Sequence, residues 1–460
     1  MSNRKIKTFA PKGTRDFLPV QMFTRNKIIN LIKKIFEKYG YEPLETPSIE
    51  RLDVLTGKYG EEGDQLIFKI LKRGTGLDKV GVELKEFTVT DYKDIIDLGL
   101  KYDLTVPLCR VIAMHKDKIT FPFKRYQIQP VWRADKPQKG RYREFYQCDV
   151  DVAGSSSMLA DFEIIYMVYE ILKTLGFKNF LIRINNRKIL NAILEHCKIE
   201  QNKSFFVLSA IDKLDKIGKK GVINELKKKN INEKVIDNLL EIILLEGTFE
   251  QKLNELGHIF KENKIGNEGI EELKEIFYYL SKTDIDSDFY SLDLSLSRGL
   301  EYYTGPIYES VVKEPKIGSL TGGGRYDKLI GMFLGEDVPA TGTSLGIERI
   351  IDVMTELNMI PETKTITKVL ITTFDENLKQ ESINTTWKIR NSGINAELFF
   401  EPLRLNKQLS YANKKGIPFV CIIGPDEKKQ NKVKVKNMKT GEEKLIENNK
   451  IVEFIKSITD

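Results

Sequence analysis

Arginine and lysine are concentrated between residues 124 and 143, where seven Lys or Arg residues stand against one Asp. This local balance of +6 compares with a formal net charge of +7 for all 460 residues. A structural turn does not require Arg133, Arg141 and Arg143. Their planar guanidinium groups are well suited to binding phosphate. The cluster therefore predicts an anion-binding site; the alternative is a charged turn that is merely solvated.

The residues around this cluster predict a β-hairpin with a basic tip. Val131-Trp132 and Phe145-Tyr146 are apolar and favour strands, and a polar turn lies between them. Gln147 and Asp151 are four positions apart, so their side chains face the same side of one strand. A strand face with Arg133, Gln147 and Asp151 is a poor core face, and it suits the floor of a site for a polar ligand.

Three further polar segments adjoin predicted strands. Gly322-Gly323-Gly324 lacks the lysine and the following helix of a phosphate loop, so it predicts a strand end closely approached by another group. Ser297–Gly305 is polar and aromatic, with an exposed turn as the alternative. Gly342–Arg349 ends a strand and begins a helix, a pattern that is weak by itself.

Composition limits the class of protein. A chain of 460 residues predicts roughly three domains. It has no apolar stretch of 18 residues and no apolar segment at its N-terminus, so we expect neither a transmembrane helix nor a secretory signal. Its four scattered cysteines predict a reducing cytoplasm and no zinc site. The three histidines lie outside the hairpin, which disfavours a histidine base, and the positive balance permits a nucleic-acid partner.

Hydrophobic periodicity divides the chain into segments. Thr24–Tyr39 is predicted as an amphipathic helix, and Tyr41–Thr46 as a strand. Leu71–Leu98 is predicted as one or two additional surface hairpins. Lys, Glu, Ile and Leu at helical spacing predict a small inserted helical domain between about Glu200 and Lys282. After Pro361, strands alternate with helices, which predicts a small parallel α/β unit closed by a hairpin and a helix.

Taken in order, these segments resemble one family. The helix and strand before Pro47, the basic hairpin and the G-x-x-x-G-x-E-R helix start resemble motifs 1, 2 and 3 of class II aminoacyl-tRNA synthetases. Tyr102–Pro107, Gly140–Asp151, Arg298–Gly305 and Pro11–Asp16 narrow the resemblance to the histidyl-tRNA synthetase family. The resemblance covers nearly the whole chain.

The resemblance implies an α+β catalytic core with an antiparallel sheet, a helical insertion and a C-terminal α/β anticodon-binding domain. The corresponding boundaries are 1–190 and 286–360 for the core, 191–285 for the insertion and 361–460 for the last domain. It further implies a cytoplasmic histidine–tRNA ligase that uses ATP and Mg²⁺, acts on L-histidine and tRNA(His), and forms a C2 homodimer through its first motif. No membrane partner and no metal bound by Cys or His are expected.

The resemblance also assigns roles to individual residues. Arg298 and Arg133 are the expected catalytic cations. Those expected to bind histidine are Asp103, Thr105, Gln147, Asp151, Arg298, Tyr303 and Tyr326. Those expected to bind ATP are Arg133, Asp135, Arg141, Arg143, Phe145 and Arg349. An acid and a phenol that contact both imidazole nitrogens would exclude apolar analogues.

Gln138 occupies the loop position that lies near the extra 5′ guanosine of tRNA(His) in bacterial relatives. The tip of the hairpin, Lys136–Gly140, is expected to lie too far from the strand floor to serve the small substrates. An amide donates and accepts at once, as the recognition of a base edge requires. The alternative is that Gln138 only caps a loop.

Two rival functions remain from the sequence. One is a non-catalytic regulatory subunit of the first enzyme of histidine biosynthesis, which resembles the core but lacks the anticodon module. The other is a tRNA-sensing regulatory domain, which is usually fused to a kinase. The retained Arg133, Arg298 and Arg349, together with the C-terminal domain, disfavour both, and the segment Arg298–Gly305 disfavours another amino acid.

Overall fold

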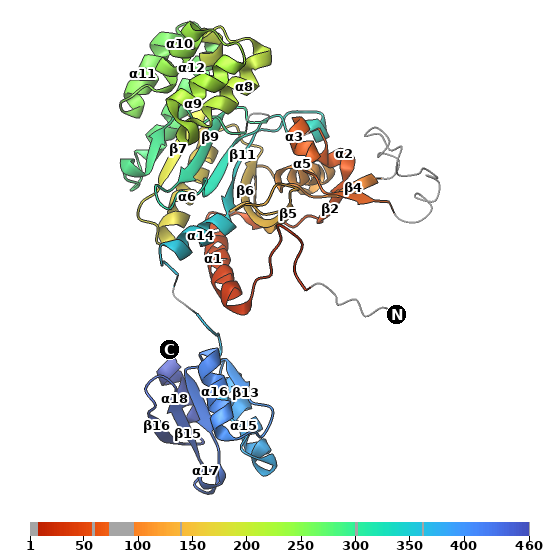
Figure 1. Ribbon diagram of the computed structural model, residues 1–460, viewed down its shortest axis with the longest axis vertical. Helices are drawn as coiled ribbons and strands as arrows, with labels where there is room; N and C mark the ends of the chain where they lie inside the picture. The colour runs from red at the N-terminus through yellow and green to blue at the C-terminus, as the bar shows by residue number, and fades with distance from the viewer. Residues whose placement is uncertain are drawn as a thin grey trace. The chain divides into compact units, whose positions relative to one another are not determined.

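The computed structural model describes residues 8–57, 60–72, 96–138, 140–299, 302–360 and 363–459. The chain divides into two compact units (Figure 1). The first comprises Met1–Asp16 with Ile29–Met359, and the second comprises Phe17–Ile28 with Ile360–Asp460. The helical insertion predicted for 191–285 lies within the first unit, and the four predicted segment boundaries remain predictions.

Within the described residues, an eight-stranded sheet forms the centre of the first unit, in the order β1-β5-β6-β11-β10-β9-β7-β8. The edge pairs β1–β5 and β7–β8 are parallel, and the pairs between them are antiparallel. The predicted α+β core with an antiparallel sheet is therefore confirmed. The strands are β1 (Glu42–Pro43), β5 (Phe123–Trp132), β6 (Glu144–Ala153), β7 (Leu181–Asn186), β8 (Tyr290–Leu292), β9 (Pro306–Val311), β10 (Thr321–Arg325) and β11 (Ala340–Gly346).

The predicted basic hairpin is formed by β5 and β6, which pair from Phe123 opposite Ala153 to Trp132 opposite Glu144. Its strands are longer than the two apolar pairs suggested. Residues Gly322–Gly324 lie inside β10 and not at a strand end, since Gly323 pairs with both Tyr308 and Thr343. The close approach predicted for these glycines is nevertheless present, as described below.

Helices cover the sheet of the first unit. Ser157 caps α6, accepting a hydrogen bond from the Leu159 amide at 3.2 Å, and α6 packs on β6, β10 and β11. Buried Ile164, Ile165 and Val168 on α6 belong to the core. Helix α6 spans Met158–Thr174, and the other helices of this part are α2 (Leu52–Leu55), α3 (Gly60–Gln65), α5 (Thr105–Met114), α7 (Arg187–His196), α13 (Gly331–Leu334) and α14 (Ile347–Glu356). Helix α1 (Pro19–Lys38) contributes residues to both units, which divide between Ile28 and Ile29.

The predicted helical insertion is confirmed as a bundle at one end of the core (Figure 1). It consists of α8 (Gln201–Ile211), α9 (Leu214–Lys228), α10 (Glu233–Ile243), α11 (Phe249–Phe260) and α12 (Lys264–Leu280). Asn232, Thr248 and Asn263 cap the last three of these helices. The Ser297 hydroxyl donates to the carbonyl of Leu208 at 2.7 Å, which joins the bundle to a segment that borders the candidate site.

A small antiparallel sheet, β2-β4-β3, adjoins the core. Its strands are β2 (Ile49–Arg51), β3 (Lys69–Leu71) and β4 (Ile96–Leu100). Leu52, Leu55 and Ile67 form its buried cluster. Most of the additional hairpin predicted for Leu71–Leu98 falls on residues 73–95, which lie outside the described residues.

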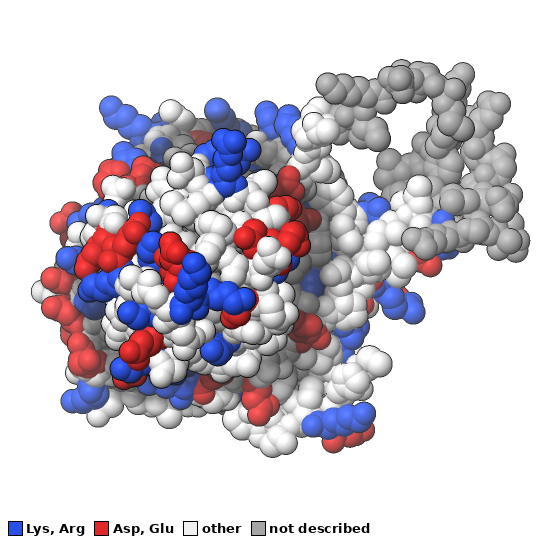
Figure 2. Space-filling view, turned by 90° about the horizontal axis from the view of Figure 1, so that it is seen from below, with Lys and Arg blue, Asp and Glu red and all other residues white. Residues whose placement is uncertain are grey.

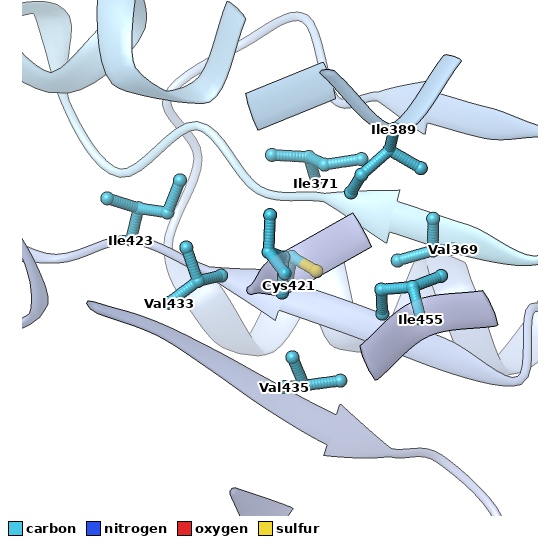
Figure 3. Close-up of a cluster of buried hydrophobic side chains, with 9 residues drawn as sticks. Val369, Ile371, Ile389, Cys421, Ile423, Val433, Val435 and Ile455 are labelled. Atoms are coloured by element: carbon cyan, nitrogen blue, oxygen red, sulfur yellow. The ribbon is translucent and has the colours of Figure 1, made fainter. Parts of the chain in front are cut away.

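The second unit confirms the predicted α/β module. Its sheet has the order β13-β12-β14-β15-β16, in which β13, β12 and β14 are parallel and the last two strands form the predicted hairpin. Val369, Ile371, Ile389, Cys421 and Val435 are in its core (Figure 3). The elements are β12 (Val369–Ile371), α15 (Lys379–Asn391), β13 (Ala396–Leu398), α16 (Leu405–Lys415), β14 (Phe419–Ile422), α17 (Pro425–Lys429), β15 (Lys432–Asn437), β16 (Glu443–Glu447) and α18 (Ile451–Thr459).

Charged side chains of both signs are interspersed on the face shown in Figure 2. In the second unit, Lys434 forms an ion pair with Glu427, and Lys436 forms one with Glu443. Among the described residues, no helix combines the length and the apolar character that crossing a membrane requires.

Candidate functional site

A polar cavity of about 620 Å³ opens on the central sheet. It is bordered by β6, β10 and β11, by the tip of the hairpin and by the segment before β9. Every residue that the sequence analysis assigned to the site lines this cavity except Arg143. Residues from five separate parts of the sequence therefore meet at one place.

One end of the cavity is acidic. Asp149 and Asp151 lie on β6, and Gln147, Asp149 and Asp151 share a strand face because they are two residues apart. Asp103 precedes α5, and its Oδ1 accepts a hydrogen bond from the Val106 amide at 3.1 Å. The three aspartates are between 3% and 8% exposed, so their charges are largely removed from water.

A buried arginine lies beneath these carboxylates. Arg125 on β5 is fully buried, and its Nη2 lies 2.8 Å from Asp151 Oδ2. The Tyr326 hydroxyl donates to the other oxygen of Asp151. Burial raises the pKa of Asp151, while Arg125 and the Tyr326 hydrogen bond oppose the rise. Burial also raises the pKa of Asp149, to about 7, against the opposing charge of Arg125.

Aromatic residues close this acidic end. The rings of Tyr302 and Tyr303 lie 4.5 Å apart between centroids, and their hydroxyls are 3.4 Å apart. Burial raises the pKa of both phenols, so they remain protonated and can donate hydrogen bonds at neutral pH. Gly342 leaves room for the aspartate opposite it, because a Cβ there would lie 2.0 Å from Asp151 Oδ1.

The other end of the cavity is basic, with Arg133, Arg141, Arg298 and Arg349 in its wall. The guanidinium group of Arg133 lies 4.3 Å from the ring centroid of Tyr102 and 5.2 Å from that of Phe145. Burial lowers the pKa of Arg349, and the nearby charges of Arg298, Arg133 and Arg141 lower it further. Arginines that repel one another in this way form a site for an anion.

Arg298 is held against the backbone of β10. A Cβ on Gly322 would lie 1.7 Å from Arg298 Nη1, so a larger residue here would displace the guanidinium group from this position. Arg298 Nη1 lies 3.3 Å from Glu309 Oε2 and 3.4 Å from the Thr321 carbonyl. The predicted close approach to the triple glycine is thus made by the predicted catalytic arginine.

Glu309 also belongs to a charged network that the sequence analysis did not identify. Its Oε1 lies 3.3 Å from Arg183 Nη1, and its Oε2 accepts from the Ser319 hydroxyl at 2.6 Å. Arg183 in turn contacts Asp293 at 2.6 Å and Asp215 of the helical insertion at 2.5 Å. No sequence spacing relates these residues, so the network becomes visible only in the folded chain.

Arg143 does not reach the cavity wall. Its Nε donates to the Asp135 carbonyl at 3.0 Å, and its amide donates to the Gly13 carbonyl at 2.8 Å. Its aliphatic part packs where a Cβ on Gly13 would lie, at 2.8 Å. In this structure Arg143 therefore joins the hairpin to the N-terminal segment, and the geometry does not favour the contact with ATP expected for it.

The N-terminal segment Pro11–Asp16 makes a second connection. The Arg15 guanidinium lies 3.4 Å from the ring centroid of Tyr142, and its Nη2 lies 2.8 Å from Glu348 Oε2 at the start of α14. Glu348 and Tyr142 both line the cavity. The segment thus ties the hairpin tip to the strand-to-helix turn between β11 and α14.

The tip of the hairpin lies over the cavity, not away from it. The backbones of Gln138 and Arg141 exchange hydrogen bonds of 3.1 and 2.9 Å, and both residues line the cavity. Arg141 Nη2 also lies 2.7 Å from Asp135 Oδ1. The expectation that the tip is too distant to serve the small substrates is therefore not supported by the geometry.

The sequence analysis missed Asp149, Lys216, Tyr142 and Glu348 in the cavity wall. Asp149 could have been identified, because the spacing that placed Gln147 and Asp151 on one face also includes position 149. Lys216 comes from the helical insertion, and no local pattern relates it to the hairpin. Among the described residues, no group of three or more His, Cys, Asp or Glu side chains is arranged to hold a metal ion.

Solved structures share this fold. The histidyl-tRNA synthetase from Nostoc sp. has a TM-score of 0.83 with this chain at 31% sequence identity, covering 99% of this chain and 100% of that one. The apo histidyl-tRNA synthetase of S. aureus shares the fold, with a TM-score of 0.69 at 23% identity. The antiparallel sheet, the basic hairpin and the strand-to-helix turn of β11 and α14 define a class II aminoacyl-tRNA synthetase.

Sequence comparisons identify the family. The family profile described as histidyl-tRNA synthetase matches residues 13–78 and 73–350, and the profile described as anticodon binding domain matches residues 368–458. The chain is 46% identical to the histidine–tRNA ligase of Cytophaga hutchinsonii over 438 residues, 94% of this chain and 96% of that one. It is 41% identical to that of Gloeobacter violaceus over 457 residues. The chain belongs to the histidyl-tRNA synthetase family.

Proposed function

We propose that this chain is a histidine–tRNA ligase, which activates L-histidine with ATP and transfers it to the 3′ end of tRNA(His). The observation that carries the proposal is the division of one cavity into an acidic end and a basic end. The acidic end suits the ammonium and imidazole of histidine, and the basic end suits the phosphates of ATP. The border between the ends is where the histidine carboxylate and the α-phosphate would meet.

In the first step, a carboxylate oxygen of histidine attacks the α-phosphorus of ATP. A carbon–oxygen–phosphorus linkage forms, the bond to the β-phosphate breaks, and pyrophosphate leaves with the electron pair. Two anions approach one another, so positive charge fixed at the reacting atoms lowers the barrier. Arg298 and Arg133 supply this charge. Glu309 positions Arg298, because its Oε2 lies 3.3 Å from Arg298 Nη1.

Arg349 and Arg141 hold the outer phosphates, and Phe145 covers the adenine. Asp135 accepts a hydrogen bond from the adenine amino group. This contact replaces the ion pair that Asp135 forms with Arg141. Mg²⁺ fits this site as a companion of the phosphates, because it is usually bound by substrate phosphates with one or two carboxylates. When bound, Mg²⁺ supplies further positive charge to the phosphate oxygens.

Histidine is selected at the acidic end. Asp103, Thr105 and Gln147 bind the α-ammonium group, and Asp151 and Tyr303 contact the two imidazole nitrogens. Tyr326 holds Asp151 in place through its hydroxyl. An apolar analogue would leave buried polar groups unpaired, which costs far more than a lost methylene contact.

In the second step, a hydroxyl of the terminal ribose attacks the carbonyl carbon of histidyl-adenylate, and AMP leaves. The proton passes to a phosphate oxygen of the adenylate, because no protein base adjoins the cavity border among the residues assigned to the site. Gln138, at the hairpin tip, contacts the acceptor end of the RNA. The second unit binds the anticodon, supported by the match of residues 368–458 to an anticodon-binding domain.

We also propose a cytoplasmic location and a homodimer, which are typical of the family. The chain also resembles, at 22% identity, a protein described as an ATP phosphoribosyltransferase regulatory subunit/histidyl-tRNA synthetase. A purely regulatory role is disfavoured, because the arginines of the basic end and the anticodon-binding module are both present.

ATP–pyrophosphate exchange measured with each of the twenty amino acids tests the proposal. We expect exchange with histidine alone, followed by charging of tRNA(His) when RNA is added. Exchange with another amino acid would reject the substrate assignment. The absence of exchange with every amino acid would favour a regulatory role.

A further inference from the structure

Asp149 is a buried carboxylate of the cavity wall that has no role in the function proposed above. It lies on β6 between Gln147 and Asp151, and the three side chains face the same side of the strand. Asp149 is 3% exposed and lines the cavity. Its Oδ1 lies 3.5 Å from Gln147 Nε2, and Ser344 on β11 also forms a hydrogen bond with it.

Charged groups of several elements face this carboxyl. Arg125 approaches it from β5, Asp151 lies beside it on β6, and Asp103 faces it from the segment before α5. Tyr303 faces it from the segment before β9. Arg125 is committed to Asp151, at 2.8 Å. The acidic wall therefore holds three carboxyl groups close to one arginine, and a cationic ligand would favour their ionised forms.

We propose that Asp149 binds the α-ammonium group of the amino-acid substrate, as a second acidic residue of that subsite beside Asp103 and together with Gln147. This inference rests on the proposed function, because it takes histidine as the occupant of the acidic end. The 3.5 Å contact with Gln147 places the carboxyl at the ammonium end of the subsite. The Tyr326 hydroxyl donates to Asp151, the residue assigned to the imidazole.

Proton release should accompany binding. Burial raises the pKa of Asp149 to about 7, partly opposed by Arg125, so below this pH most of the free protein holds a proton on Asp149. An ammonium group against the carboxyl favours the ionised form and lowers this pKa. The proton therefore leaves to solvent when histidine binds, and histidine affinity rises as the pH increases through about 7.

Calorimetric titration of histidine, in two buffers of different ionisation enthalpy, measures this proton release. The wild-type protein and the Asp149→Asn variant would be compared at about pH 6 and about pH 8. The imidazole of the ligand titrates in both experiments, so the difference between the two proteins isolates Asp149. Glu170→Gln is the matched control, since Glu170 pairs with Lys38 and does not line the cavity.

We expect wild-type protein to release more protons than Asp149→Asn at the lower pH, and Glu170→Gln to match wild type. The affinity of Asp149→Asn should be about tenfold lower than wild type at about pH 8, the loss of one hydrogen bond to a charged group. The affinities of the two proteins should approach one another at about pH 6, where Asp149 of the free wild-type protein is mostly protonated and must lose its proton to bind histidine. Equal proton release in both proteins, or an affinity ratio that does not change with pH, would overturn the inference.

A second ligand tests the wild-type protein alone, should the variant fail to fold. Imidazolepropionate lacks the ammonium group, so its binding should release no proton from Asp149. Release equal to that with histidine would move the contact to the imidazole and overturn the assignment. If histidine neither binds nor supports pyrophosphate exchange, the proposed function itself fails. If it does both without proton release from Asp149, only this inference fails.

Discussion

The two ends of the cavity differ in how they are built. Most of the acidic end lies on one strand, where β6 places Gln147, Asp149 and Asp151 in a row beside a single buried arginine. Asp103 joins them from the segment before α5. The basic end is assembled from distant segments, because its arginines come from the hairpin, from the segment before β9 and from α14. A strand fixes the spacing of its side chains. A cluster of side chains from distant segments needs supporting contacts to hold it in place, such as the contact of Glu309 with Arg298.

Both ends hold like charges close together before any substrate binds. The pKa of Asp149 is raised to about 7 at one end, and that of Arg349 is lowered at the other. Each shift means that the charged form is less favoured than in water, and a ligand of opposite charge would favour it. We infer that histidine relieves the repulsion between the carboxylates at the acidic end, and that ATP separately relieves the repulsion between the arginines at the basic end.

Loss of the border arginine should have the largest effect. Arg298→His is expected to slow adenylation by a factor on the order of 10² to 10³, as for the removal of one preorganised charge donor. Histidine affinity, set at the acidic end, should change much less. Single-turnover pyrophosphate exchange and equilibrium binding of histidine measure the two effects, and near-normal exchange would contradict the catalytic role.

At the acidic end, Tyr303→Phe should raise the KM for histidine by about tenfold, through the loss of one hydrogen bond to a buried polar group. The KM for ATP should stay nearly unchanged, because the phosphates lie at the other end. Steady-state exchange assays with each substrate varied in turn test this separation. A raised KM for ATP with a normal KM for histidine would reverse the assignment of the two ends.

Substitution of Glu309 tests whether the basic end, which is built from distant segments, depends on its supporting contacts. Glu309→Gln should lower kcat for exchange by about tenfold, because Arg298 loses its charged partner at 3.3 Å. Asp215→Asn is the control, since its carboxyl is 59% exposed and contacts Arg183 one step further away. Exposed pairs contribute about 0–1 kcal/mol, so the control should stay close to wild type. Equal losses in both variants would show a general effect of the network on folding.

The smallest effect is expected at the hairpin tip. Gln138→Ala should leave pyrophosphate exchange intact and slow aminoacylation, reducing the preference for tRNA that carries the extra 5′ guanosine. A base contact of this kind contributes about 1–3 kcal/mol. Charging of matched tRNAs with and without that guanosine measures the preference, and an unchanged ratio would leave Gln138 as a loop residue.

Local patterns in the sequence predicted the parts of the molecule that depend on local geometry. The period of two along β6 placed Gln147 and Asp151 on one face, and the same rule extends to Asp149. The composition of 200–282 predicted the helical insertion, because helices there are built from contacts between neighbouring residues. The residues of the cavity were assigned to one site because their motifs resemble those of a known family. No spacing in the sequence links these residues.

The remaining features depend on contacts between distant residues. Arg143 was predicted to bind phosphate by its type, yet its position beside Gly13 turns it toward the N-terminal segment. Glu309 acquires its importance only where Arg183 and Arg298 meet it, across separations that no periodicity encodes. The role of Gly322 likewise becomes visible only in the folded chain, where the guanidinium group of Arg298 packs on it.

The most direct test of the charge division is the affinity of two fragments of histidine. L-histidinol keeps the ammonium and the imidazole but lacks the carboxylate, whereas imidazolepropionate lacks the ammonium. Calorimetry on the wild-type protein at about pH 8 should show histidinol binding at least tenfold more tightly than imidazolepropionate, a difference of about 1.4 kcal/mol or more. Equal affinity, or tighter binding of imidazolepropionate, would contradict the assignment of the acidic end to the cationic part of histidine.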